Sequence, residues 1–134
     1  MGKGQKRILL VEDDRYLRRA CEESLRNHGF RVVAAVDGEE AIRKAAAEPF
    51  DAILLDVLIP KFSGVEVLRD LKSKESTRST PVIVLTNSSR DDDIREMRKL
   101  GIDGYHVKAE LSLDELARQV DQLFEKMNNR REAE

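Results

Sequence analysis

Five short runs of apolar, often β-branched residues alternate along the chain with segments whose apolar residues recur at helical spacing. Strands that are buried on both faces of a parallel sheet have continuous apolar runs of this kind. The runs lie at residues 7–11, 31–35, 52–55, 82–85 and 104–107. Because short connections between alternating strands and helices favour right-handed crossovers, helices should cover both faces of the sheet. The sequence therefore predicts an α/β, doubly wound (βα)5 three-layer sandwich with a five-stranded parallel sheet.

Several predicted helices carry residues that are typical of helix ends. Ser63 and Ser112 are each followed three residues later by glutamate, which is the spacing of a capping box. Asp37 stands at the start of an alanine-rich helix, where an N-cap side chain is expected. Gly29 follows the first helix and has the place of a left-handed C-terminal cap. These signals set the predicted helix boundaries.

The chain length fits one domain. A chain of 134 residues can bury about two thirds of the surface that it exposes when unfolded, so a core forms without disulfides or metals. No repeat or second zone of composition is present. We expect a single domain over residues 1–134, with its core at about 6–127 and flexible tails at 1–5 and 128–134. This leaves no room for an attached output domain.

Charge and cysteine content exclude several classes of protein. Lys and Arg total 24 and Asp and Glu total 26, a net charge of −2, which gives no electrostatic reason to bind nucleic acid or an anionic membrane. No apolar run approaches the ~18 residues of a membrane span, and no secretory h-region follows the N-terminal residues. A single cysteine, Cys21, excludes an internal disulfide and suits a reducing compartment. We expect a cytoplasmic protein.

Polar side chains follow four of the predicted strands where each strand ends. Ligands of open parallel sheets bind beyond the carboxyl ends of the strands, so these side chains should meet. Converging carboxylates repel one another unless a cation offsets them, and oxygen ligands suit Mg²⁺. An ammonium and a hydroxyl opposite them provide what the oxygens of a phosphoryl group need. The residues are Glu12, Asp13, Asp14, Asp56, Thr86 and Lys108.

Four motifs together carry a family resemblance. They are ILLVEDD at residues 8–14, DAILLDVLIPKFSG at 51–64, PVIVLTN at 81–87 and GIDGYHVK at 101–108. In this order they resemble the receiver domain of two-component response regulators, and the similarity extends from about residue 6 to residue 127. The resemblance implies a flavodoxin-like fold with the strand order 2-1-3-4-5.

The same resemblance implies a phosphoprotein and a metal site. Asp56 matches the carboxylate that becomes an aspartyl phosphate, with a phosphohistidine of a sensor histidine kinase or histidine phosphotransfer protein as the donor. Asp13 and Asp56 would bind Mg²⁺ directly, the backbone carbonyl of Leu58 would add a ligand, and Glu12 would act mainly through water. The chain would be a signalling protein that catalyses only its own phosphorylation and dephosphorylation, not an enzyme with an external substrate.

The resemblance also implies roles for residues that contact the phosphoryl group and for a switch. Lys108 and Thr86 would contact the phosphoryl oxygens, and Thr86 together with Tyr105 would form the switch that responds to them. The switch would reshape the surface of the fourth helix, the strand at 104–107 and the last helix, which would then bind a downstream effector protein. The chain would be a monomer or a phosphorylation-dependent dimer.

Two positions depart from the family pattern. Most receivers have a cis proline after the lysine, whereas this chain has Ala109, and a non-proline cis bond costs about 3 kcal/mol. Either the bond is trans and the loop at 108–111 is displaced, or strain is stored there. Asn87 stands where the family usually has a small residue.

Three functions are compared. A stand-alone receiver, acting as a shuttle or phosphorelay intermediate, accounts for all of the strand-end residues. A receiver-like binding module that works without phosphorylation is the alternative, favoured by Ala109 and Asn87. A phosphohydrolase of the haloacid dehalogenase type needs a carboxylate two residues after its nucleophile, where this chain has Leu58. We therefore favour the first function over the other two.

Overall fold

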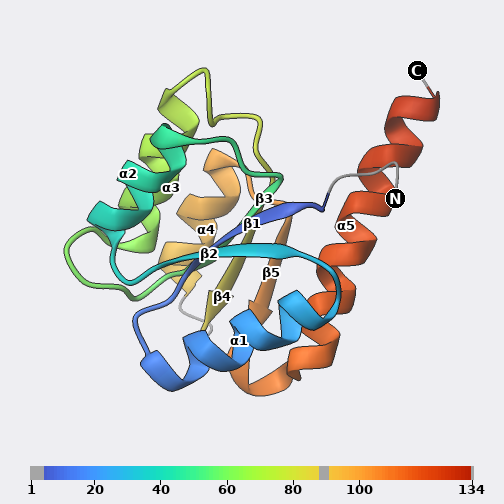
Figure 1. The fold of residues 1–134 in the computed structure, drawn as a ribbon. Coiled ribbons are helices and arrows are strands. Elements are labelled where there is room, and N and C mark those ends of the chain that lie inside the picture. The colour runs from blue at the N-terminus through green and yellow to red at the C-terminus, as the bar shows by residue number, and fades with distance from the viewer. Residues whose placement is uncertain (1–4, 88–90, 134) are drawn as a thin grey trace.

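The computed structural model of this chain describes residues 5–87 and 91–133. Five strands form one sheet in the order β2-β1-β3-β4-β5, and all neighbouring strands are parallel (Figure 1). The strands are β1 (Arg7–Val11), β2 (Arg31–Ala35), β3 (Ala52–Asp56), β4 (Val82–Thr86) and β5 (Gly104–Val107). The predicted fold and strand order are confirmed, and β3 and β4 extend by one residue to include Asp56 and Thr86.

Helices cover both faces of the sheet, as Figure 1 shows. α2, α3 and α4 lie on one face, where they pack over one buried cluster, and α1 and α5 lie on the other face over a second cluster. The helices are α1 (Arg15–Asn27), α2 (Gly38–Ala47), α3 (Gly64–Ser73), α4 (Asp91–Leu100), the 3-10 helix η1 (Lys108–Glu110) and α5 (Leu113–Ala133). The result is the three-layer sandwich that the sequence predicts.

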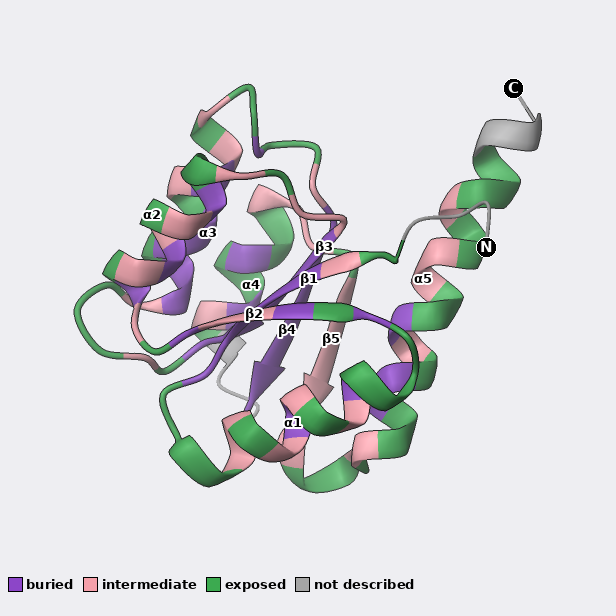
Figure 2. Cartoon of the chain, viewed as in Figure 1, coloured by how far each residue is buried: buried purple, intermediate pink, exposed green. Residues whose placement is uncertain are grey.

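The side chains of the strands alternate between the two clusters. Leu9 and Val11 face α2, α3 and α4, whereas Ile8 and Leu10 face α1 and α5. β3 and β4 are buried along their whole length, as Figure 2 shows in purple. Because this apolar centre fixes the position of every strand, the residues at the carboxyl ends of the strands are held on a rigid scaffold.

Side chains cap the helix ends, largely where the sequence places them. Ser63 and Glu66 form the complete capping box of α3. Asp37 accepts a hydrogen bond from the backbone N of Glu40, 2.8 Å away, at the start of α2. Gly29 has a φ of 94°, the left-handed conformation expected after α1. These caps satisfy backbone groups that have no partner within the helix.

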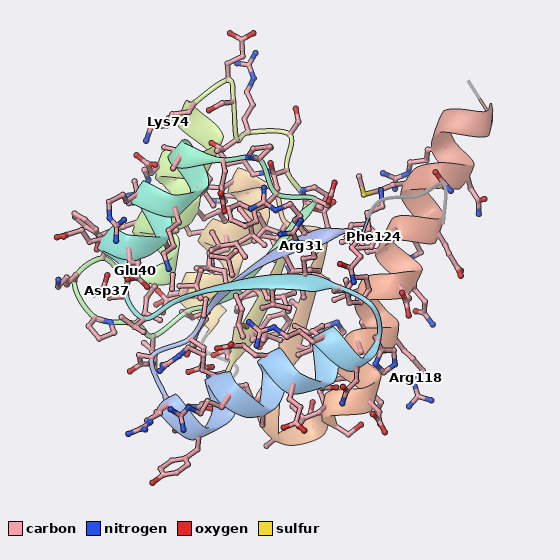
Figure 3. All side chains as sticks on the ribbon, viewed as in Figure 1. Arg31, Asp37, Glu40, Lys74, Arg118 and Phe124 are labelled. Atoms are coloured by element: carbon pink, nitrogen blue, oxygen red, sulfur yellow. The ribbon has the colours of Figure 1, made fainter. Side chains whose placement is uncertain are left out.

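α5 differs from its predicted length. The helix continues through most of the predicted tail at 128–134, as far as Ala133, because nothing in the sequence there breaks a helix. Phe124, labelled in Figure 3, anchors α5 through a tilted contact with Phe30, with ring centroids 5.8 Å apart. The other expected tail, at 1–5, falls almost wholly outside the described residues. Within residues 5–87 and 91–133, no helix has the length and apolar character to cross a membrane.

β2 lies at one edge of the sheet. Cationic side chains from the flanking helices donate hydrogen bonds to its outer carbonyls, those that point away from β1. Arg26 of α1 donates to the carbonyl O of Val32 at 3.2 Å. Lys44 of α2 donates to the carbonyl O of Ala34 at 2.6 Å. Two backbone acceptors of this edge are therefore satisfied by side chains.

Candidate functional site

The polar residues that follow the strands meet at the carboxyl edge of the sheet. Glu12 directly follows β1 and Asp56 ends β3, and both side chains are buried. Asp13 is exposed beside them. Each of these three residues offers a carboxylate oxygen that lies within 4.8 Å of those of the other two. The structure thus brings three of the predicted metal ligands into one group, which we call the acidic cluster.

Asp14 lies outside the acidic cluster. We expected it to converge with Glu12 and Asp13, but its side chain caps α1, accepting a hydrogen bond from the backbone N of Leu17 at 3.0 Å. The backbone N of Asp14 donates to Glu12 Oε2 at 3.1 Å. Asp14 therefore helps to fix Glu12, but its own carboxylate serves the helix.

Lys108 projects into the acidic cluster from the start of η1. Its Nζ lies 2.8 Å from Asp56 Oδ2 and 2.5 Å from Glu12 Oε1, and its side chain is only 11% exposed. The peptide bond between Lys108 and Ala109 is trans. The chain continues as a single 3-10 turn that places the lysine in the site without a cis bond. The departure at Ala109 thus leaves the ammonium among the carboxylates.

Burial perturbs the ionisation of this group. Burial raises the pKa of Glu12, the hydrogen bond from Lys108 offsets this only in part, and the charge of Asp56 raises the pKa further. Burial also opposes the charged form of Lys108, but its hydrogen bonds to Asp56 and Glu12 outweigh this effect, so the pKa of Lys108 is raised. The Lys108 ammonium pairs with Glu12 and Asp56, two of the three carboxylates of the acidic cluster, and the all-oxygen donor set of the cluster fits Mg²⁺.

The loop at 57–63 follows Asp56 directly. The backbone N of Leu58 donates to Asp56 Oδ1 at 3.2 Å, so the two carboxylate oxygens of Asp56 have different partners. The side chain of Leu58 is 52% exposed and points away from the core. The loop therefore orients the carboxylate, while a metal contact through the Leu58 carbonyl remains a prediction.

Thr86 and Tyr105 share one face of the sheet. Thr86 ends β4 and is buried, and in the register of the neighbouring strands Val84 pairs with Tyr105. The Tyr105 ring packs against the cluster under α2, α3 and α4, and its hydroxyl is buried with no hydrogen-bond partner among the described residues. Arg98 of α4 lies over the ring, 5.9 Å from its centroid. The predicted switch residues therefore lie close in the fold, with the tyrosine turned inward.

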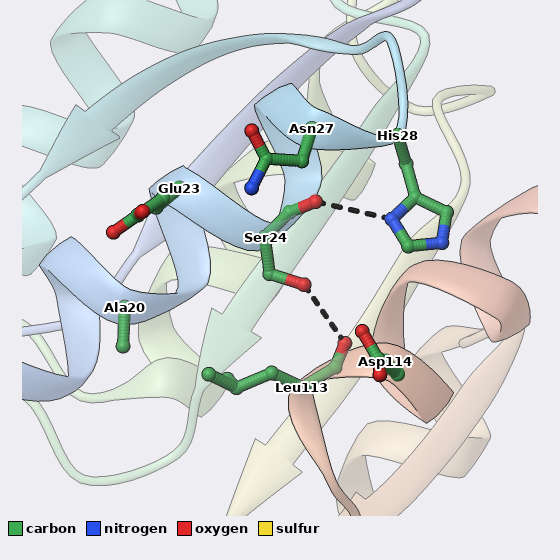
Figure 4. A pocket seen from close by; sticks show the side chains of 7 residues that line it. All are labelled: Ala20, Glu23, Ser24, Asn27, His28, Leu113 and Asp114. Atoms are coloured by element: carbon green, nitrogen blue, oxygen red, sulfur yellow. Dashed lines mark hydrogen bonds between the residues drawn. The ribbon is translucent and has the colours of Figure 1, made fainter.

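A hollow of about 270 Å³, which the sequence does not predict, lies between α1 and α5 (Figure 4). Ser24 Oγ donates to the carbonyl O of Leu113 at 3.2 Å and joins the two helices. The lining residues are Ala20, Glu23, Ser24, Asn27, His28, Leu113 and Asp114. None of them is a buried polar side chain without a partner, so the hollow itself suggests no chemistry.

A family profile and the related proteins of known sequence indicate the same family for this chain. The profile of the response regulator receiver domain matches residues 8–121. Over 118 residues the chain is 41% identical to the gliding motility regulatory protein of Myxococcus xanthus, covering 87% of this chain and 15% of that protein. It is 33% identical to the transcriptional regulatory protein CrdR of Helicobacter pylori, covering 90% of this chain and 55% of that protein. The chain thus spans only part of these longer relatives.

Solved structures share the fold over most of the chain. The chemotaxis protein CheY4 of Vibrio cholerae superposes with a TM-score of 0.82 at 27% identity, covering 89% of this chain and 98% of that chain. The receiver domain of the sensor histidine kinase PA1611 of Pseudomonas aeruginosa has a TM-score of 0.81 at 32% identity, covering 89% and 97%. That structure is described as having a magnesium ion coordinated in its active site cleft.

Proposed function

Because this chain belongs to the response regulator receiver domain family, we propose that it accepts a phosphoryl group on Asp56 from a phosphohistidine. The donor would be a sensor histidine kinase or a histidine phosphotransfer protein. The observation that carries the proposal is the setting of Asp56, which is buried at the end of β3 with the Lys108 ammonium 2.8 Å from one oxygen. Receiver domains are components of two-component signalling, and they are signalling proteins, generally not enzymes in the usual sense.

The residues of this chain have distinct roles in the proposed transfer. An oxygen of Asp56 attacks the phosphorus while the bond from phosphorus to the donor imidazole nitrogen breaks, and that nitrogen keeps the electron pair and takes up a proton. Lys108 and the backbone N of Leu58 hold the two oxygens of Asp56 in place before the reaction. Lys108 and Thr86 then contact the phosphoryl oxygens.

The acidic cluster is proposed to bind Mg²⁺. Asp13, Asp56 and the Leu58 carbonyl would hold the ion directly, and Glu12 would act mainly through water. The crowding of three carboxylates, two of which pair with Lys108, supports this assignment. When bound, Mg²⁺ supplies positive charge that offsets both the carboxylates and the phosphoryl oxygens.

Phosphorylation would change the surface formed by α4, β5 and α5. The new phosphoryl group adds negative charge and acceptor oxygens beside Thr86, and these bias the pair of Thr86 and Tyr105 between two arrangements. We propose that a downstream effector protein, or a second copy of the chain, binds this surface. We also propose the cytoplasm as the compartment, since the buried thiol of Cys21 suits reducing conditions.

The test is phosphorylation by a small donor. We expect Mg²⁺ and acetyl phosphate to add one phosphoryl group to the intact mass, and Asp56→Asn or a chelator to abolish it. Asp14→Asn is the matched control, because Asp14 lies beside the acidic cluster but caps α1, and asparagine caps a helix equally well. It should be phosphorylated like the wild type.

One result would replace the proposal. A wild-type protein that binds Mg²⁺ but acquires no adduct from acetyl phosphate, and none from a phosphorylated histidine kinase, would not be a phosphoacceptor. The binding module that works without phosphorylation would then be the better description.

A further inference from the structure

The loop after Asp56 contains a strained turn. Lys61 has a φ of 72°, and within the described residues it is the only non-glycine residue with a positive φ. The backbone N of Phe62 donates to the carbonyl O of Pro60 at 3.0 Å, which closes a three-residue γ-turn around Lys61. A strained turn of this kind persists only where the surrounding structure holds it.

The start of α2 holds this turn. The backbone N of Gly38, the first residue of the helix, donates to the same carbonyl O of Pro60 at 3.0 Å. Lys61 Nζ lies 3.5 Å from Asp37 Oδ2. Gly38 also has no room for a side chain, because a β-carbon there would lie 2.6 Å from the β-carbon of Phe62. We call this contact between the start of α2 and the turn the brace.

The two ends of the same loop are also held together. The backbone N of Gly64 donates to the carbonyl O of Val57 at 2.9 Å. A β-carbon at Gly64 would lie 2.6 Å from the carbonyl O of Asp56. Leu58 therefore lies on a short segment that is anchored to the site at one end and to α2 at the other.

We propose that Gly38 is a positioning residue for the metal site, acting through the brace. Because Gly38 has no side chain, the turn at Pro60 and Phe62 can lie against the start of α2, and this contact sets the position of the Leu58 backbone. The backbone N of Leu58 binds Asp56, and the Leu58 carbonyl is the proposed metal ligand. The inference rests on the proposed function, because it concerns the Mg²⁺ affinity of the same site. Gly38 itself lies in α2 and supplies no side chain to the site.

The experiment compares Gly38→Ala with the wild type by titration calorimetry with Mg²⁺. We expect about tenfold weaker Mg²⁺ binding, the loss typical when the residues that orient a metal ligand are changed. Hydrogen exchange at the amides of Leu58 and Phe62 should become faster. Phosphorylation by acetyl phosphate should recover at saturating Mg²⁺, since Asp56 and Lys108 are unchanged.

Gly29→Ala is the matched control. Gly29 has a φ of 94°, so alanine is strained there, but nothing lies within 4 Å of the new β-carbon. The variant should lose stability while keeping the wild-type Mg²⁺ affinity. A general loss of stability is thereby separated from an effect of the brace.

Lys61→Gly is a second variant. It should fold, because glycine adopts a positive φ without strain. It keeps a backbone that can form the turn but removes the ion pair between Lys61 and Asp37, so Mg²⁺ binding should weaken, though less than in Gly38→Ala. Wild-type Mg²⁺ affinity in Gly38→Ala, or in Lys61→Gly if Gly38→Ala does not fold, would overturn the inference. A wild-type protein that fails to bind Mg²⁺ at all would instead overturn the proposed metal site on which it rests.

Discussion

The charged side chains at the two ends of the sheet differ in their exposure to water. At the amino end, Arg7 of β1 pairs with Glu48 at 2.5 Å, and the two side chains remain 28% and 41% exposed to water. At the carboxyl end, Glu12 and Asp56 are almost fully buried, and Lys108 is their shared cation. An exposed ion pair changes the free energy of unfolding little, whereas buried charges that are not fully compensated lower the stability of the folded state. We therefore expect the charges at the carboxyl end, where the proposed site lies, to lower the stability of the folded state, and those at the amino end to have little effect.

The largest effect should follow from removing the cation at the carboxyl end. Lys108→Met leaves Glu12 and Asp56 buried without their partner, and we expect a loss of about 3 kcal/mol in the free energy of unfolding at neutral pH. The loss should shrink in acid, where the carboxylates become protonated. Urea denaturation at several pH values measures both effects. An unchanged free energy of unfolding would contradict the contrast between the two ends.

Adding a cation to the same end should have the opposite effect. At a Mg²⁺ concentration about a hundredfold above its dissociation constant, we expect the free energy of unfolding to rise by about 2.7 kcal/mol. Thermal unfolding with and without Mg²⁺ measures this, with a sodium salt at equal ionic strength as the control. Asp13→Asn should lose most of the response, because it removes an exposed, proposed ligand without disturbing the buried Glu12 and Asp56.

A smaller gain should follow from removing one buried negative charge. The pKa of Glu12 is raised by burial, so the folded state holds its proton above the ordinary value of 4.5 and loses stability as the pH rises through the raised pKa. Glu12→Gln removes this cost, and we expect a gain of about 1 kcal/mol at neutral pH. The gain should disappear as the pH falls toward 4.5. Matched denaturation curves at neutral and acid pH test the sign.

The smallest effect should come from the amino end. Glu48→Gln breaks the pair with Arg7, and we expect a change of about 0.5 kcal/mol or less because both side chains contact water. The same urea assay provides the measurement, at low and high salt. A loss as large as that of Lys108→Met would show that the two ends do not differ.

The sequence predicted most of the scaffold and the convergence of the candidate site residues, and the reasons are physical. Apolar runs indicate the strands, and parallel strands bring their carboxyl ends to one edge of the sheet. Glu12, Asp56 and Lys108 are therefore expected at the same edge, where the structure has them. The strand order came from the resemblance to receiver domains, since periodicity alone does not determine it. The prediction that Asp14 joins the other carboxylates was wrong. An aspartate before a helix can serve either as a cap or as a ligand, and here it caps α1.

The brace was beyond sequence analysis for a different reason. Gly38 looks like an ordinary residue at the start of a helix, and only the approach of Phe62 shows why a side chain is excluded there. The γ-turn at Lys61 likewise has no glycine or asparagine to announce its positive φ. Contacts between loops that are distant in the sequence leave no periodic trace in either segment.

The cations on the outer carbonyls of β2 have a consequence for how copies of this chain could assemble. A strand added beside β2 would have to displace Arg26 from Val32 and Lys44 from Ala34, and both are charge-assisted hydrogen bonds. Edges blocked in this way resist the growth of a sheet from one molecule into the next. Pairs of this protein should therefore form through helices or through the opposite edge at β5, and fibrillar stacking along β2 is disfavoured.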